Sequence, residues 1–273
     1  MKQKMIALLA IVSVFCSVSA QRVNETVTLF GKDQLQGFTI NIDNYSIDVV
    51  DGAMANIFEN QYKLKGSKKK GYHVYENQQC SAFGDARYDI YFTTTEIGKK
   101  NNKSVQVTLV VSNGNMNCIT FTNDPRTSRN IVNFLEKFPR DVESYNTTLR
   151  IQSLENELTK LNKERDALIK DSTKVEDKIA NMNNTLKETT EKLDKVTNHI
   201  NELQAEFNKS HDTAVMEEIN QASKEQQSLQ KSQTNCQKSL LNLRNDLAKI
   251  IDKLTKNALA IEKAENELKT LKN

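Results

Sequence analysis

The residues of this chain that could take part in chemistry are few, and they lie far apart in the sequence. Cysteine and histidine are the usual nucleophiles, bases and metal ligands, and the chain has 4 cysteines and 3 histidines. These residues are Cys16, Cys80, Cys118, Cys236, His73, His199 and His211. No two of them stand at the spacing of a metal site or a C-x-x-C redox motif. We therefore expect no metal and no cofactor.

The sequence also lacks the local motifs of the common enzyme classes. There is no G-x-S-x-G, no H-E-x-x-H and no glycine-rich phosphate-binding loop. Asp85 and Asp89 could be proposed as a carboxylate pair for general acid–base catalysis. Gly84 and the strand pattern after it favour a turn and a solvent-facing position for them instead. We predict a non-enzymatic protein.

Two short segments, 68–70 and 99–103, concentrate positive charge. If the strands around them form a meander, both connections lie at the same end of the sheet. The candidate basic patch consists of Lys68, Lys69, Lys70, Lys99, Lys100 and Lys103. It is either a pair of solvated turns or a docking patch for an anionic component of the cell envelope.

The first 20 residues have the composition of an export signal. Lys2 and Lys4 precede an apolar run from Met5 to Phe15, and small residues lead to a cleavage site after Ala20. The alternatives are an uncleaved anchor and lipidation at Cys16. We expect a protein exported to the periplasm or secreted, with a bacterial source favoured, and no later segment is long and apolar enough to span a membrane.

Export would permit a disulfide. Cys80 and Cys118 are expected at the same end of the meander, so we predict a bridge between them, with two unpaired thiols as the alternative. Cys236 falls at a core position of a helix, where a thiol behaves as a small hydrophobic group.

Residues 21–139 have the patterns of an α+β domain. Alternating apolar residues predict strands, and residues 47–58 have helical spacing. Asp124-Pro125 is a typical helix start, and the helix that follows should end or kink at Pro139. The expected strands are 37–42, 72–75, 87–95, 105–111 and 117–122, with a further one possible at 23–30.

This β-α-β-β-β-β-α order gives one antiparallel sheet with two helices on one face. In topology it resembles the TATA-binding-protein-like arrangement and, more loosely, the helix-grip folds, whose helix covers a ligand cavity. The resemblance concerns the fold alone and implies no function.

From residue 140 to Asn273 the chain contains neither glycine nor proline and carries a heptad repeat of apolar residues. All 8 glycines and both prolines lie before this segment. One series of core positions runs from Leu154 to Phe207, and a second, out of phase by one residue, runs from Val215 to Leu271. We therefore predict a long coiled coil over residues 140–273.

The polar segment 208–214 between the two series is either a stutter in one continuous helix or the turn of an antiparallel hairpin. Pairing positions whose numbers sum to 422 places every a position opposite a d position, which favours the hairpin. Polar core residues then face each other as two layers, Arg165 with Asn257 and Thr189 with Gln233. The flanking positions of the first arm are almost all polar, as in a two-stranded seam.

The fold class that we predict is α+β, a small antiparallel-sheet domain followed by a long antiparallel helical hairpin. The net charge of +3, from 38 basic and 35 acidic side chains, gives no reason to expect nucleic acid as a partner. We expect an exported interaction or scaffold protein that spaces or clasps an unidentified protein partner, and self-association is possible. The alternatives are a carrier of a small ligand or lipid and a periplasmic holdase-like chaperone.

Overall fold

The computed structural model of the chain describes residues 22–99 and 102–273. Contacts divide the chain into two compact units, with the boundary between Leu149 and Arg150. We call them the α+β unit and the hairpin unit. The export signal expected at residues 1–20 lies outside the described residues. The elements are β1 (Asn24–Phe30), β2 (Asp33–Asp43), α1 (Ile47–Asn56), the π-helix η1 (Ile57–Gln61), β3 (Ser67–Lys69), β4 (Tyr72–Gln79), β5 (Arg87–Lys99), β6 (Asn102–Ser112), α2 (Pro125–Ser210) and α3 (Thr213–Lys272).

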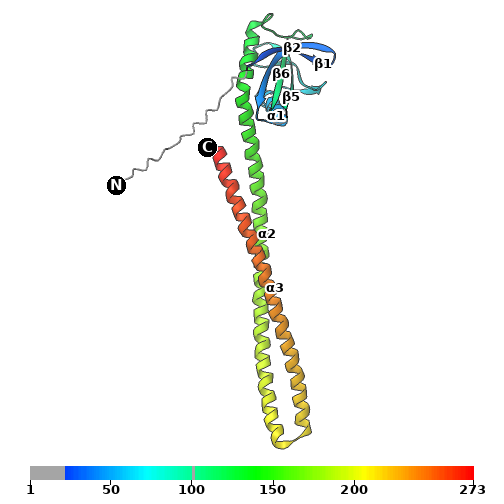
Figure 1. Cartoon of the computed structure of the whole chain (residues 1–273), viewed down its shortest axis with the longest axis vertical. Helices are drawn as coiled ribbons and strands as arrows, with labels where there is room; N and C mark the ends of the chain where they lie inside the picture. Colours follow the sequence, from blue (N-terminus) through cyan, green and yellow to red (C-terminus); the bar gives the residue numbers. More distant parts are fainter. Residues whose placement is uncertain (1–21, 100–101) are drawn as a thin grey trace, which may run out of the picture. The chain divides into compact units, whose positions relative to one another are not determined.

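The strands form one six-stranded antiparallel sheet in the order β1-β2-β6-β5-β4-β3 (Figure 1). From β2 onward the chain follows the predicted order of strand, helix, four strands and helix. The predicted α+β fold with a long helical hairpin is thus confirmed.

One predicted strand is wrong. Residues 117–122 form only a single bridge, between Ser112 and Cys118. The number of strands between α1 and α2 is still four, because the short β3, which was not predicted, precedes β4. The reason lies in the sheet order, because β6 already pairs with β5 on one side and with β2 on the other. Strand β2 takes residues 104–109 of the β6 edge, so only the end of β6 is left for this segment. There the N–H of Ile119 donates to Val111 O at 2.8 Å, and the rest of the segment folds as an irregular loop.

The main core lies between the sheet and the helices, on a single face. Alternate residues of β5 and β6, among them Ile90, Phe92, Val107 and Leu109, are fully buried there against α1, η1 and the first part of α2. The predicted inward face of these two strands is thereby confirmed. On α2 the core continues to Val142, so the α+β unit extends beyond the boundary predicted at residue 139.

A second, smaller cluster lies on the other face, where the sheet curls on itself. Phe30 of β1 packs against Tyr72 of β4 and Tyr91 of β5, with ring centroids 5.6 and 5.1 Å away. The hydroxyl of Thr28 also lies 2.5 Å from that of Tyr72. Strands that are not neighbours in the sheet thus meet over this face.

Helix α2 begins where the sequence predicts. Asp124 accepts a hydrogen bond from the backbone N–H of Thr127 at 3.0 Å, which lowers the pKa of its carboxyl group and caps the helix. Pro139 neither ends the helix nor separates a domain helix from the first arm, since α2 runs through it for 86 residues.

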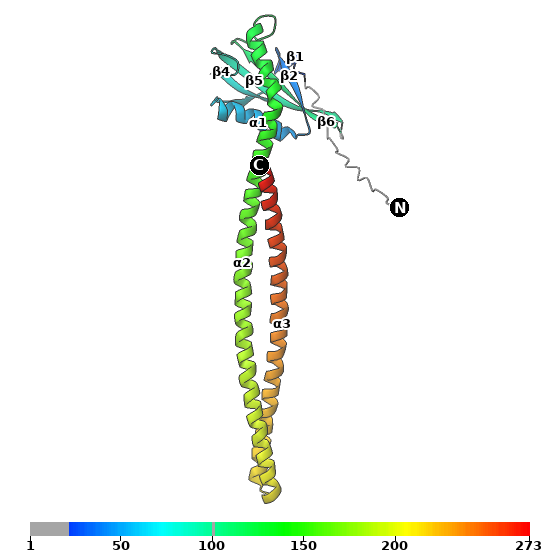
Figure 2. The ribbon, with the colours of Figure 1, turned by 90° about the vertical axis from the view of Figure 1, so that its left-hand side faces the viewer.

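The hairpin unit contains two antiparallel helices that lie side by side (Figure 2). His211 adopts a left-handed conformation with φ of 49°, and Asp212 caps α3 by accepting the N–H of Ala214 at 2.9 Å. The turn lies within the predicted segment 208–214. All the heptad core positions of both arms are buried or half-buried, with the exception of Arg165.

Candidate functional site

The two edges of the sheet are unlike each other. The β3 edge has three residues, of which Lys68 and Lys69 are charged. The β1 edge has seven residues with no lysine, arginine or proline, and Glu25 is its one charged residue. Short strands and lysines are the usual protection of a sheet edge against further pairing. Strand β1 has no such residue of its own, and Lys70 of the β3–β4 turn lies only over the ring of Phe30 at its end, 4.4 Å from the centroid.

The middle of β1 exposes two apolar side chains. Val27 is 59% exposed and Leu29 is 61% exposed, and they lie across from Gln36 and Gln34 of β2. Glu25 pairs with the core residue Phe38, so these alternate residues point to the same side of the sheet as the helices. Helix packing therefore leaves this part of the helix-side face uncovered.

The pairing of β1 with β2 also shows which backbone groups are free. Gly31 and Lys32 form a two-residue turn between the paired residues Phe30 and Asp33, and Gly31 has the φ of 68° that such turns require. The closing pair of this turn is hydrogen-bonded, and bonded pairs alternate along an antiparallel ladder. The N–H and C=O groups of Glu25, Val27 and Leu29 thus point away from β2, toward the free edge.

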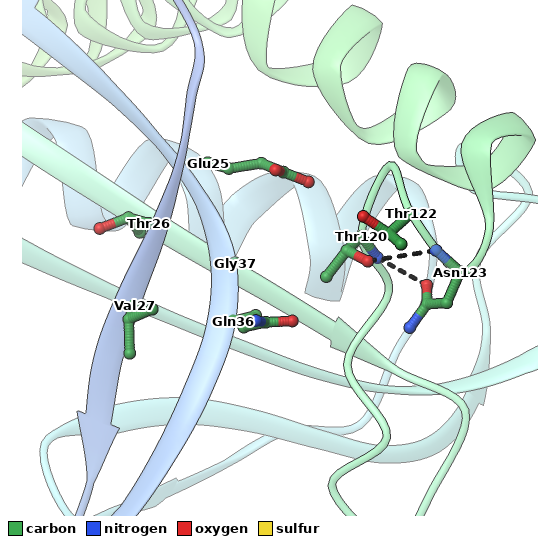
Figure 3. A pocket seen from close by; sticks show the side chains of 8 residues that line it. All are labelled: Glu25, Thr26, Val27, Gln36, Gly37, Thr120, Thr122 and Asn123. Carbon is green, nitrogen blue, oxygen red and sulfur yellow. Dashed lines mark hydrogen bonds between the residues drawn. The ribbon is translucent and has the colours of Figure 1, made fainter.

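The loop of residues 116–123, which contains the predicted strand 117–122, lies beside β1 and β2 (Figure 3). We call this loop the wall of the site. The N–H of Phe121 donates to Glu25 Oε1 at 2.8 Å, and its ring meets that of Phe38 edge-on at 5.7 Å. The side chain of Asn123 donates to Cys118 O at 2.7 Å and accepts the N–H of Thr120 at 2.9 Å. Together with the single bridge to β6, these bonds hold the loop in place.

Between this loop and the β1–β2 hairpin lie two hollows of about 550 and 300 Å³. Because they share Val27, Gln36 and Asn123, we treat them as one groove, the β1 groove. Its lining residues are Glu25, Thr26, Val27, Gln34, Gln36, Gly37, Met116, Asn117, Cys118, Thr120, Thr122 and Asn123.

Exposed apolar side chains of the α+β unit gather around this groove. Of the five large ones that are exposed among its described residues, Val27, Leu29, Met116 and Phe121 lie on β1 or the wall, and Leu149 lies on α2. The remaining lining is mostly hydroxyl and amide groups. Burial raises the pKa of the Cys118 thiol, so this sulfur is a poor nucleophile at neutral pH. The chemistry of the groove suits binding.

The lysines of the candidate patch are largely neutralised by acidic neighbours. Lys69 Nζ lies 2.7 Å from Glu76 Oε1, and Lys103 Nζ lies 2.9 Å from Glu96 Oε2. Lys68 and Lys70 each have a carboxylate oxygen at 3.8 Å, from Asp51 and Asp33 respectively. Lys100 lies outside the described residues, and Lys99 is the last residue of β5.

These lysines also form two separate groups. The hydroxyl of Thr93 donates to Gly71 O at 3.1 Å, which places the β3–β4 turn level with Thr93, while β5 continues to Lys99. Six residues of strand span about 20 Å. The lysines of segment 68–70 therefore do not join those of the β5–β6 hairpin in one patch.

The predicted disulfide is wrong, because Cys80, Cys118 and Cys236 are all free and buried. Cys80 belongs to the main core on the helix-covered face, and Cys118 belongs to the small cluster on the opposite face. The sheet lies between the two thiols. The prediction depended on a strand at 117–122 that does not form.

We expect mass spectrometry of the mature, non-reduced protein to find three modified cysteines after denaturation and alkylation. In the folded protein at pH 8, Cys80 should stay unmodified, since burial raises its pKa to about 11 and leaves little thiolate. Prior reduction should leave the count of modified thiols unchanged. A single modified thiol in the sample without reduction would show that the Cys80–Cys118 disulfide does form.

The polar layers of the seam form differently from the prediction. Gln233 donates to Thr190 Oγ1 at 3.0 Å, one residue beyond the expected Thr189, whose hydroxyl bonds to the carbonyl of its own helix at Thr185. Asn257 donates to Leu161 O at 3.1 Å.

Arg165, the predicted partner of Asn257, is exposed and lies 3.4 Å from Asp166. A long charged side chain reaches solvent in preference to a buried amide. A core glutamine likewise reaches the hydroxyl at a flanking e position, as Gln226 does with Thr197 at 2.9 Å. The pairing of a glutamine at heptad position a with a threonine at heptad position e of the other arm could therefore have been predicted from the sequence.

A polar cluster joins α1 to the sheet and was not predicted. Asp51 of α1 lies 2.9 Å from His73 Nε2 and accepts a hydrogen bond from Thr94 at 3.0 Å. The ring of His73 stacks on Phe92 with a centroid distance of 4.3 Å. Asp89, one of the two candidate carboxylates, accepts the N–H of Asn77 at 2.7 Å, at the bulge of β4. The Asp51 contacts thus connect α1 to β4 and β5, and the Asp89 contact connects β5 to β4.

Among residues 22–99 and 102–273, no group of histidine, cysteine and acidic side chains could hold a metal ion. In the same part of the chain, no helix is both long and apolar enough to cross a membrane. Comparisons of the chain with protein-family models, with curated proteins and with solved structures found no match.

Proposed function

We propose that this protein is an exported, non-enzymatic interaction protein whose α+β unit binds an extended segment of a partner protein along β1. The observation that carries the proposal is the gathering of Val27, Leu29, Met116 and Phe121 beside an edge strand that has no lysine, arginine or proline of its own. Exposed apolar clusters of this kind mark interaction sites in soluble proteins.

The proposed binding mode is strand addition. The outward N–H and C=O groups of Glu25, Val27 and Leu29 would pair with the backbone of the incoming segment, and these bonds would supply affinity. Alternate side chains of that segment would enter the β1 groove, where apolar and amide groups would select them. The partner that suits this site is a β-forming segment with apolar residues at every second position.

The helical hairpin would act as the spacer or clasp of this interaction protein. Its seam is formed by the chain itself, and ion pairs such as Arg150 with Glu267 at 2.7 Å and Lys272 with Glu155 at 2.8 Å join the two arms. Export is expected from residues 1–20 alone.

The packing favours this function over a lipid or small-ligand carrier. A helix-grip carrier needs a cavity between sheet and helix, whereas here that space holds Phe58, Phe83, Phe92 and Phe138, all fully buried. The hollows described above lie instead beside β1.

Selection of a random-peptide display library on the mature protein tests the proposal. We expect enriched peptides with alternating apolar residues, and we expect Val27→Lys to weaken their binding at least tenfold, because a lysine on the edge opposes pairing. Ser67→Lys, an exposed substitution on the other edge strand, is the matched control and should leave binding unchanged. Failure to enrich any peptide, or binding that tolerates Val27→Lys, would overturn the proposal.

A further inference from the structure

Helix α3 carries an exposed stripe that has almost no charge. Eleven positions in alternating steps of four and three residues run along one face of the helix, beside the seam and outside it. Although 27% of the chain is charged, Arg244 is the one charged residue among them. The members of this α3 stripe are Ser223, Gln227, Gln230, Thr234, Gln237, Leu241, Arg244, Ala248, Ile251, Thr255 and Ala258.

The C-terminal half of this stripe, from Leu241 to Ala258, carries its apolar side chains, and the large ones are open to solvent. Leu241 is 61% exposed and Ile251 is 52% exposed, and Leu259 beside the stripe is 61% exposed. On α2, Ile169 is 49% exposed and occupies an e position, as Ile251 does on α3. The ion pair between Glu155 and Lys272 joins two other e positions, so the e positions of both arms flank the same side of the seam.

A seam of two helices needs only its a and d positions to be apolar, and a wider apolar face is typical of bundles with more helices. The polar flanking positions of the first arm predict a self-sufficient hairpin. The second arm departs from that pattern, because its apolar residues continue past the seam.

The stripe is complementary to itself in the antiparallel direction. When residues whose numbers sum to 499 are placed opposite each other, Leu241 faces Ala258 and Ile251 faces Ala248 of a second copy. Each large side chain thus meets a small one, as a knob meets a hole. A two-fold axis generates every contact twice from one patch, which is the geometry of an isologous dimer.

Charge supports the same alignment. In this register Lys238 of one copy comes next to Glu262 of the other, at both ends of the apolar segment. Within residues 150–273 neither side chain makes an ion pair in the single chain. The lysines Lys249, Lys256 and Lys263 lie on the opposite flank of α3, away from the stripe.

We propose that the α3 stripe is a self-association site, at which two copies of this chain pack α3 against α3 in antiparallel orientation. The contact is separate from the β1 groove, so each site can fail its test without the other.

Sedimentation equilibrium of the mature protein tests the association. We expect a dimer at micromolar concentration and an at least hundredfold weaker association in the double variant Leu241→Lys and Ile251→Lys. Both side chains are exposed, so circular dichroism of the variant should show unchanged helix content. Asn235→Lys with Asn242→Lys, on the opposite flank of α3, is the matched control and should remain dimeric.

A monomer at 100 μM wild-type protein, a concentration about a hundred times above a micromolar Kd, would overturn the proposal. So would a dimer that persists in the Leu241→Lys, Ile251→Lys variant, because its interface then lies elsewhere. Val27→Lys identifies the alternative of a dimer that forms through β1. This variant should separate such a dimer, whereas Leu241→Lys with Ile251→Lys should not.

Disulfide trapping tests the register. Leu241→Cys and Ala258→Cys variants, mixed before oxidation, should give a covalent dimer, because these positions face each other across the two copies. Either variant oxidised by itself should remain monomeric on a non-reducing gel. In a dimer of one variant, the two introduced cysteines, one from each copy, lie about 25 Å apart along the helix axis. Equal crosslinking of the single variants would contradict the antiparallel alignment.

Discussion

Replacing Phe58 with alanine should lower the free energy of unfolding of the α+β unit by about 3–5 kcal/mol. Phe58 lies in the π-helix η1 and is fully buried, and its ring contacts aromatic residues from both the sheet and α2. The ring centroids of Tyr75, Phe83, Phe92 and Phe134 lie 5.2, 6.3, 5.9 and 5.6 Å from that of Phe58. Removing the ring leaves a cavity that four rigid neighbours cannot fill.

Urea denaturation followed by tyrosine fluorescence of the mature protein measures this loss. The matched control is Phe121→Ala, which removes the same ring from a position that is 44% exposed. Its cost should stay below about 1.5 kcal/mol, because most of the transfer free energy is absent at an exposed site. Equal losses for the two variants would show that Phe58 does not connect the layers as described.

The sequence was most informative where one periodic pattern controls many residues. The heptad series predicts the hairpin and its turn, because an apolar seam of this length can be buried in few ways. The alternation of Ile90 and Phe92 with their polar neighbours likewise predicts which face of the sheet is buried. Asp124-Pro125 predicts the start of α2 by a purely local mechanism.

Predictions were wrong where the outcome depends on competition between distant segments. Residues 117–122 alternate as a strand does, but β2, which lies far away in the sequence, takes residues 104–109 of the β6 edge and leaves room for a single bridge. The predicted Cys80–Cys118 disulfide was wrong for the same reason, because the position of Cys118 followed from that strand. The short β3 was missed because Ser67-Lys68-Lys69 has no apolar residue to mark it.

The β1 groove could be predicted only in part. The absence of lysine from Asn24–Phe30 was visible in the sequence, whereas the exposure of Val27 and Leu29 depends on how far the helices reach over the sheet. The contacts of the polar seam residues shifted for a related reason. Heptad positions fix which residues enter the seam, but side-chain length decides whether Gln233 meets Thr189 or Thr190.

Replacing Pro139 with alanine should raise the free energy of unfolding by about 1–3 kcal/mol. Proline in a helix interior lacks the N–H that would bond to the carbonyl four residues earlier, here that of Leu135, and costs about 3 kcal/mol relative to alanine. Thermal unfolding monitored by circular dichroism measures the gain, and Glu136→Ala, an exposed change one turn earlier, should stay within about 0.5 kcal/mol of wild type. The substitution tests the continuity of α2, because only an uninterrupted helix gains a hydrogen bond at residue 139. If Pro139→Ala leaves stability unchanged or lowers it, the domain helix and the first arm of the hairpin are two helices joined at this proline.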